Sequence, residues 1–136
     1  MANYYKFVAG IADDDAYLVS GKPFISGSIT APGNTGSPIP VKIEFPAVTR
    51  WVRVVNSHAS LVVRFGFSSG GMLPLNSNYG TVPPASSTPP MEMKITEIYL
   101  MADRNTAMPG ISVIAGLTAI PTGSIVDNWS GSIGVG

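Results

Sequence analysis

The stretch from Thr49 to Phe67 constrains the fold more than any other part of the sequence. Two runs rich in valine and aromatic residues, 49–55 and 60–67, flank a short polar turn. In the second run the apolar residues recur with a period of two, as in a strand that buries one face. The first run is apolar on both faces, which indicates a strand in the middle of a sheet. Together the two runs predict a β-hairpin at the centre of the core.

Other segments carry similar patterns and predict further strands at residues 4–8, 16–19, 24–30, 39–45, 91–101 and 111–118. The 15 glycines and 12 prolines punctuate the chain and leave little room for long helices. These features predict an all-β fold, an antiparallel β-sandwich of about eight strands. Two sheets joined by long crossing loops favour a single jelly roll, and an immunoglobulin-like sandwich is the alternative.

Two of these segments carry a further signal. In residues 39–45 the apolar side chains at odd positions, beginning with Ile39, share one face. Pro40 lacks an amide hydrogen, so we expect this strand to begin at a sheet edge. In residues 91–101 the apolar phase changes at Thr96-Glu97, which predicts a β-bulge or a bend from one strand into the next.

The length of 136 residues suffices for one jelly-roll domain, which we expect to span residues 1–136. Residues 68–90 are rich in glycine and proline, with one brief strand around Leu73 to Tyr79. We expect this segment to be the main exposed loop, of a length that is usually functional or interacting, and the sequence leaves open whether it contacts a receptor or a neighbouring subunit. From about residue 122 the chain is rich in glycine and serine, which predicts a C-terminal arm.

The charge content is low and balanced. Eight basic and eight acidic residues give a formal net charge of zero, and only 12% of the residues are charged. This balance offers no basic patch for direct nucleic-acid binding. No apolar run reaches the ~20 residues that cross a bilayer, so no membrane association is expected. A charge-poor surface does little to hold copies apart, and it favours a homo-oligomer.

One motif invites a catalytic interpretation. Residues 66–70 read Gly-Phe-Ser-Ser-Gly and match the Gly-x-Ser-x-Gly nucleophile elbow of hydrolases. That elbow needs a helix after the serine, and the sequence predicts none here. The single histidine, His58, precedes the serine, which reverses the chain order of the hydrolase triad. We therefore expect the end of a strand rather than an active site.

The acidic residues give no better candidate for chemistry. Asp13, Asp14 and Asp15 are adjacent, and neighbouring side chains of a strand point apart, so they wrap a calcium ion poorly. An acidic turn is the simpler interpretation. Glu92 and Glu97 are the only carboxylate pair on strong strands, and the phase change between them gives no geometric support for glycoside cleavage. We expect no catalytic residue, no cofactor and no metal, and hence a protein that is not an enzyme.

Three residues are candidates for an interface: His58, Tyr79 and Trp129. His58 lies in a predicted turn and lacks the further ligands that zinc requires. Trp129 is an apolar anchor within the predicted arm, suited to docking on a neighbouring subunit. The three arginines of the central runs are expected to pair between strands or between subunits rather than to bind an anion: Arg50, Arg53 and Arg64.

Four strand-like runs carry a resemblance to a known class of proteins: residues 50–56, 61–65, 91–100 and 112–121. In the residue pattern of the strands and in their order along the chain, they resemble the single jelly-roll penton and minor capsid proteins of large icosahedral double-stranded DNA viruses. They are also similar to head-decoration proteins of tailed phages. The resemblance implies a capsid component whose copies meet through strand edges and loops, as a pentamer or a trimer. It implies no catalytic residues.

Two functions follow from these observations. The first is a structural virion protein at the capsid surface, which self-associates, contacts other capsid proteins and binds no cofactor. The second is a carbohydrate-binding β-sandwich module. In that alternative, the exposed aromatic residues Tyr79, Tyr99 and Trp129 would stack on a glycan receptor.

Overall fold

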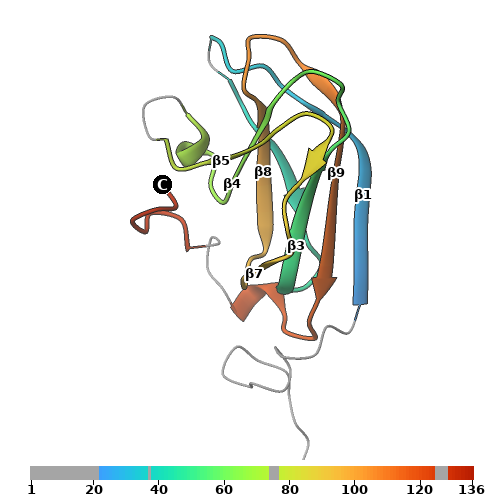
Figure 1. Cartoon of the computed structure of the whole chain (residues 1–136). Helices are drawn as coiled ribbons and strands as arrows, with labels where there is room; N and C mark the ends of the chain where they lie inside the picture. The colour runs from blue at the N-terminus through green and yellow to red at the C-terminus, as the bar shows by residue number, and fades with distance from the viewer. Residues whose placement is uncertain (1–21, 37, 74–76, 125–128) are drawn as a thin grey trace, which may run out of the picture.

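A computed structural model describes residues 22–36, 38–73, 77–124 and 129–136, which form a two-layered β-sandwich (Figure 1). The predicted strands at 4–8 and 16–19 and the acidic triplet at 13–15 lie outside the described residues. The elements are β1 (Lys22–Ala31), β2 (Val41–Glu44), β3 (Thr49–Asn56), β4 (Val63–Gly66), the 3₁₀ turn η1 (Gly70–Met72), β5 (Gly80–Val82), β6 (Ser86–Ser87), β7 (Met91–Glu92), β8 (Glu97–Ala102), β9 (Met108–Leu117) and the 3₁₀ turn η2 (Thr122–Ser124).

The strands pair like one long antiparallel ribbon that has been rolled up. β1 pairs with β9, β2 with β8, β3 with β7 and β6, and β4 with β5. Two further pairings, β3 with β9 and β4 with β8, close the roll into two sheets. The five-stranded sheet has the order β1-β9-β3-β6, with β7 also on β3, and the four-stranded sheet has the order β2-β8-β4-β5. This is the predicted single jelly roll, in which β6 and β7 act as one interrupted strand.

The core lies between the two sheets, because each strand turns its apolar phase inward. Val52 and Val54 of β3, Ile98 and Leu100 of β8, and Val113 of β9 are all fully buried. The alternation predicted for residues 111–118 is confirmed, since every inward position of β9 from Ile111 to Leu117 is buried. Stacked sheets lie about 10 Å apart, so the facing side chains of the two sheets interdigitate in one buried cluster.

The predicted hairpin at Thr49–Phe67 is wrong. Its two strands, β3 and β4, lie in different sheets and share no backbone pairing. Both strands have one strongly apolar face, and they bury these faces against each other across the sandwich instead of lying side by side. The six residues between Asn56 and Val63 cross from one sheet to the other. The prediction that β3 is a central strand is confirmed.

The change of apolar phase at Thr96-Glu97 also arises because the chain passes from one sheet to the other. β7 belongs to the five-stranded sheet and β8 to the four-stranded sheet, so the chain bends between layers at residues 93–96. The predicted bend from strand to strand is therefore confirmed. Thr49 stabilises the crossing: its buried hydroxyl donates to the carbonyl of Met93 (2.8 Å) and accepts from the N–H of Ile95 (3.2 Å).

Residues 39–45 follow the prediction only in part. β2 is an edge strand that begins directly after Pro40, as a residue without an amide hydrogen requires. Ile39, however, is 82% exposed, whereas Pro40 is buried. The predicted inward phase therefore starts at Val41, because Ile39 precedes the strand and its direction is not set by the pleat.

The segment 68–90 is not a single exposed loop. It contains η1, β5 and β6, and Met72 and Val82 within it are buried. Of the brief strand predicted around Leu73 to Tyr79, the described residues 73 and 77–79 are not in a strand, and they lie between the 3₁₀ turn η1 and β5. Strands of two and three residues are too short to leave a periodic signal between prolines and glycines.

The described end of the predicted arm, residues 129–136, folds back beside η1 and β5 of its own chain (Figure 1). The Ser68 hydroxyl donates to the carbonyl of Val135 (2.8 Å) and accepts from the N–H of Gly71 (3.0 Å). A Cβ on Gly71 would lie 2.3 Å from the Val135 oxygen, so only glycine permits this approach.

Candidate functional site

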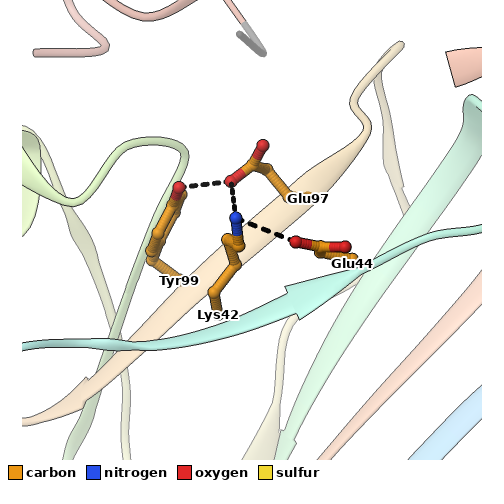
Figure 2. Close-up of polar contacts among 4 residues, drawn as sticks. All are labelled: Lys42, Glu44, Glu97 and Tyr99. Atoms are coloured by element: carbon orange, nitrogen blue, oxygen red, sulfur yellow. Dashed lines mark hydrogen bonds and ion pairs between the residues drawn. The ribbon is translucent and has the colours of Figure 1, made fainter. Parts of the chain in front are cut away.

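The outward face of the four-stranded sheet carries a polar cluster at its β2–β8 side (Figure 2). Lys42 lies opposite Tyr99, and Glu44 lies opposite Glu97, so all four side chains share this face. The Lys42 ammonium is 2.8 Å from Glu44 Oε1 and 3.8 Å from Glu97 Oε2. The Tyr99 hydroxyl donates to the same Glu97 oxygen. One lysine thus bridges two carboxylates, and a tyrosine orients one of them.

The electrostatics of this cluster keep Lys42 protonated. The hydrogen bond to Glu44 raises the pKa of Lys42 above its ordinary value of 10.5, and the negative charges of Glu97 and Glu44 act in the same direction. A lysine with a raised pKa is a poor base and a poor nucleophile at neutral pH. The cluster therefore has the character of a solvated ion-pair network that links two strands.

A second polar group lies deeper on the same sheet, under η1. The Arg64 side chain is only 9% exposed, and its Nε donates to Asp103 Oδ1 at 2.6 Å. The Tyr79 ring packs over the guanidinium, with 4.2 Å between Arg64 Cζ and the ring centroid. The Arg64 NH1 group reaches the Met72 carbonyl at 3.5 Å. Tyr79 thus contacts Arg64 within its own chain, and its role at an interface stays a prediction.

The other two arginines also pair between strands, as predicted. Arg53 of β3 donates from Nε to the carbonyl of Thr88 (3.1 Å) and from NH2 to the hydroxyl of Ser87 (2.9 Å). Arg50 lies 3.4 Å from Glu92 of β7. All three arginines therefore have partners within the chain.

His58 organises the turn between β3 and β4. Its Nδ1 accepts hydrogen bonds from the N–H groups of Ser60 and Leu61, both at 3.1 Å. Its own N–H donates to Asn56 Oδ1 (3.0 Å), and its carbonyl accepts from Ala85 (2.9 Å). These contacts make His58 a turn residue, and its role at an interface stays a prediction.

Trp129 lies at the start of the final described segment, with 49% of its surface exposed. Its indole N–H donates to the carbonyl of Lys94 (3.1 Å), just before β8. His58, Tyr79 and Trp129 therefore contact three different parts of the chain and form no common site. Docking of Trp129 on a neighbouring subunit stays a prediction.

The structure does not place the residues of either catalytic interpretation, the serine motif or the glutamate pair, in a catalytic arrangement. Ser68 is 4% exposed, and its hydroxyl contacts Val135 and Gly71, with only the 3₁₀ turn η1 following it. Glu92 lies opposite Trp51 in the five-stranded sheet, whereas Glu97 lies opposite Glu44 in the four-stranded sheet. The two glutamates thus occupy opposite outward faces and do not flank one substrate.

Two shallow surface hollows are lined by described residues. One of about 280 Å³ is lined by three aromatic residues, Phe65, Phe67 and Tyr79, and by the polar residues Ser77 and Asn78. The other, about 380 Å³, lies near the start of β1 and the end of β9. Both are near the lower limit for ligand pockets. The first combines amide and hydroxyl groups with three aromatic rings, of which Phe65 and Phe67 also pack against the core and Tyr79 packs over Arg64.

The outward face of the five-stranded sheet is unusually apolar. Three rows of paired residues cross it: Pro23, Gly116, Trp51 and Glu92 in the first; Ile25, Ile114 and Arg53 in the second; Ser112, Val55 and Ser87 in the third, with Gly27 beside Ser112. We call these residues the outer apolar face. Ile25 is 70% exposed, although it lies in the middle of a ten-residue strand.

Sequence reasoning missed this face, although it left a signal. Residues 49–55 are apolar on both faces, and Ile114 stands in the outward phase of β9 between Ser112 and Gly116. Ile25 likewise alternates with the inward residues Phe24 and Ser26. Apolar residues in the outward phase of three neighbouring strands indicate a sheet that offers both of its faces for burial.

Neither a metal site nor a membrane-spanning helix is found in the described ranges. No group of three His, Cys, Asp or Glu side chains there is placed to hold a metal ion. No helix there is long and apolar enough to span a bilayer. In comparisons with known proteins, no family model, no curated protein and no solved structure matches the chain.

Proposed function

We propose that this protein is a structural virion component, a self-assembling capsid protein of the penton, minor capsid or head-decoration type. The observation that carries the proposal is the outer apolar face, which gives the five-stranded sheet a second surface to bury. A single jelly roll with zero formal net charge and few charged residues is compatible with dense packing of copies.

Within this proposal the copies form a pentamer or a trimer and contact other capsid proteins at the virion surface. The polar cluster around Lys42 forms the solvent-exposed side of the subunit, since 69% of the Glu44 side chain is exposed. Neither nucleic acid nor a membrane is a direct partner, because the balanced charges offer no basic surface for either.

Light scattering on the purified protein tests this proposal. A mass of several chains that rises with concentration is the expected result. A strictly monomeric protein from about 1 µM to about 1 mM would contradict self-assembly, since contacts weaker than that leave little net binding free energy. Self-association is measured without any partner, so the result does not depend on knowing the other capsid proteins.

Carbohydrate binding is the second candidate, favoured by the hollow lined by Phe65, Phe67 and Tyr79. Aromatic rings beside amide and hydroxyl groups suit stacking on a sugar ring. A glycan array separates the two functions: a monomer that binds a defined glycan supports the second, and an oligomer without glycan binding supports the first. In the glycan-binding case, Asn78→Ala should weaken the signal because it removes a lining amide.

A further inference from the structure

The two outward faces of the sandwich differ in chemistry. The four-stranded sheet presents Lys42, Glu44, Glu97 and Tyr99 to the outside. On the five-stranded sheet, the columns of β1 and β9 contribute only proline, isoleucine, glycine and serine to the outer apolar face. We propose that this face is a two-fold contact between two copies of the chain. The inference rests on the proposed function and adds to it the surface and the symmetry of one contact. A two-fold contact closes on two copies, so it joins neighbouring rings and is separate from the contact that repeats around a pentamer or a trimer.

The charges of the face favour a second copy over other partners. Glu92 is paired with Arg50, and Arg53 is turned toward Ser87 and Thr88 at the β6 side. The Arg53 partners are neutral groups, so the face carries one uncompensated positive charge at its β6 side and no larger charge to repel its own copy. A nucleic acid or an anionic membrane would require a larger basic excess, which neither the face nor the whole chain provides.

The arrangement of large and small residues fits a two-fold axis along β9. Such an axis lays β1 of each copy over β3 of the other, so that Pro23 faces Trp51 and Gly27 faces Val55. In the middle row Ile114 meets its own counterpart on the axis, and Ile25 lies over Arg53, whose guanidinium is held at the β6 side by Thr88 and Ser87. Face-to-face sheets pack in this way at a small angle, about 30°.

The size of the face predicts a weak contact. It spans about 10 Å from β1 to β3 and about 14 Å along the strands. A stable complex buries about 800 Å² on each partner, which is more than this face offers alone. We therefore expect reversible pairing at micromolar to millimolar concentrations, strengthened in an assembly by repetition.

Sedimentation velocity of the full chain over about 1 µM to 1 mM tests the contact with two matched variants, Ile25→Lys and Ile39→Lys. Ile39 is 82% exposed and lies off the outer apolar face, so it controls for added charge and lost surface apolarity. Ile25→Lys should raise the dissociation constant about tenfold or more, because the lysine would be desolvated in the contact. Ile39→Lys should leave it unchanged.

The outcomes separate this inference from the proposed function. Wild-type protein that stays monomeric throughout overturns both. Wild-type protein that associates, with Ile25→Lys associating equally well, overturns only the two-fold contact and leaves self-assembly standing. Both variants are expected to fold, since each replaces a side chain that is already mostly exposed.

Photo-crosslinking identifies the occupant of the face directly. A benzoylphenylalanine at position 25, in an equal mixture of ¹⁴N and ¹⁵N protein, should give mixed-isotope cross-links to peptides of β3 or β9 of another copy. The same group at position 81, exposed on β5 of the other sheet, should give none. Cross-links from position 25 that join residues of one chain only would overturn the proposal, because the chain itself would then cover the face.

Discussion

Thr49 shows how much of this fold depends on single buried polar groups. Its hydroxyl is fully buried and bridges the Met93 carbonyl and the Ile95 N–H, where the chain crosses from one sheet to the other. Thr118 has the same role nearby, since its hydroxyl donates to the Val48 carbonyl (2.7 Å). No buried side-chain nitrogen or oxygen in the described part of the chain lacks a hydrogen-bond partner.

Thr49→Val should destabilise the protein by about 2 kcal/mol, because valine keeps the shape but leaves two buried backbone groups without partners. The free energy of unfolding from urea titrations measures the loss. Thr81→Val is the matched control, since Thr81 is exposed on β5 and should change stability by less than about 0.5 kcal/mol. Equal stability of wild type and Thr49→Val would show that the crossing does not depend on this hydroxyl.

Lys42 should titrate above its ordinary pKa of 10.5, because Glu44 and Glu97 stabilise its charged form. The raised pKa means that the ion pairs stabilise the folded state below pH 10.5 and that this contribution is lost as the pH rises through the folded pKa. The contribution is small, because the lysine is exposed. NMR titration of the Lys42 side chain measures the pKa directly.

Glu44→Gln should bring the pKa of Lys42 back toward 10.5, because it removes the larger of the two partners. Glu92→Gln is the control, since Glu92 lies on the opposite outward face and pairs with Arg50. A Lys42 pKa that responds equally to both substitutions would rule out the local network in Figure 2 as its cause.

At the scale of elements, one part of the outward face of the four-stranded sheet is exposed to solvent, and another part is covered by η1 and the C-terminal residues of the same chain. Residues 129–136 and η1 lie beside β4 and β5, whereas the polar cluster lies on β2 and β8 (Figure 1). Met72 of η1 is fully buried, and a Cβ on Gly66 of β4 would lie 2.5 Å from its sulfur atom. A glycine in β4 thus makes room for the 3₁₀ turn that covers it.

Gly71→Ala should release residues 129–136 while the sandwich stays folded, because the new Cβ would collide with the Val135 carbonyl. Hydrogen exchange followed by mass spectrometry should show faster exchange in this segment and unchanged exchange in β3 and β9. Gly123→Ala is the matched control, since a Cβ on Gly123 would meet nothing within 4 Å. Unchanged exchange of the segment in Gly71→Ala would contradict the close approach.

At the scale of the whole molecule, the sequence predicts the architecture well, but it predicts poorly which strands are neighbours in a sheet. The period of two identifies which residues face a core, and the strand count then leads to a jelly roll. It does not say which strands pair, so it places β3 and β4 side by side although they face each other. The jelly-roll topology determines which strands pair. Most of these pairs join residues far apart in the sequence, so they leave no local sequence pattern.

The candidate site is harder to predict than the fold for a related reason. His58, Tyr79 and Trp129 stand out in the sequence as single residues, but the structure gives each a contact within its own chain. The outer apolar face arises only when Ile25 and Ile114 are placed in register, which a linear pattern does not reveal. A surface that residues of several paired strands form together can be recognised only once the strand pairing is known.

Methyl NMR of isoleucine-labelled protein over a concentration series tests the central claim most directly. If copies meet through the outer apolar face, the methyl signals of Ile25 and Ile114 should shift or broaden as the concentration rises. The signal of Ile39, which is more exposed but lies off this face, should stay in place. Signals of Ile25 and Ile114 that do not move at any concentration would contradict the claim that this sheet face is buried between copies.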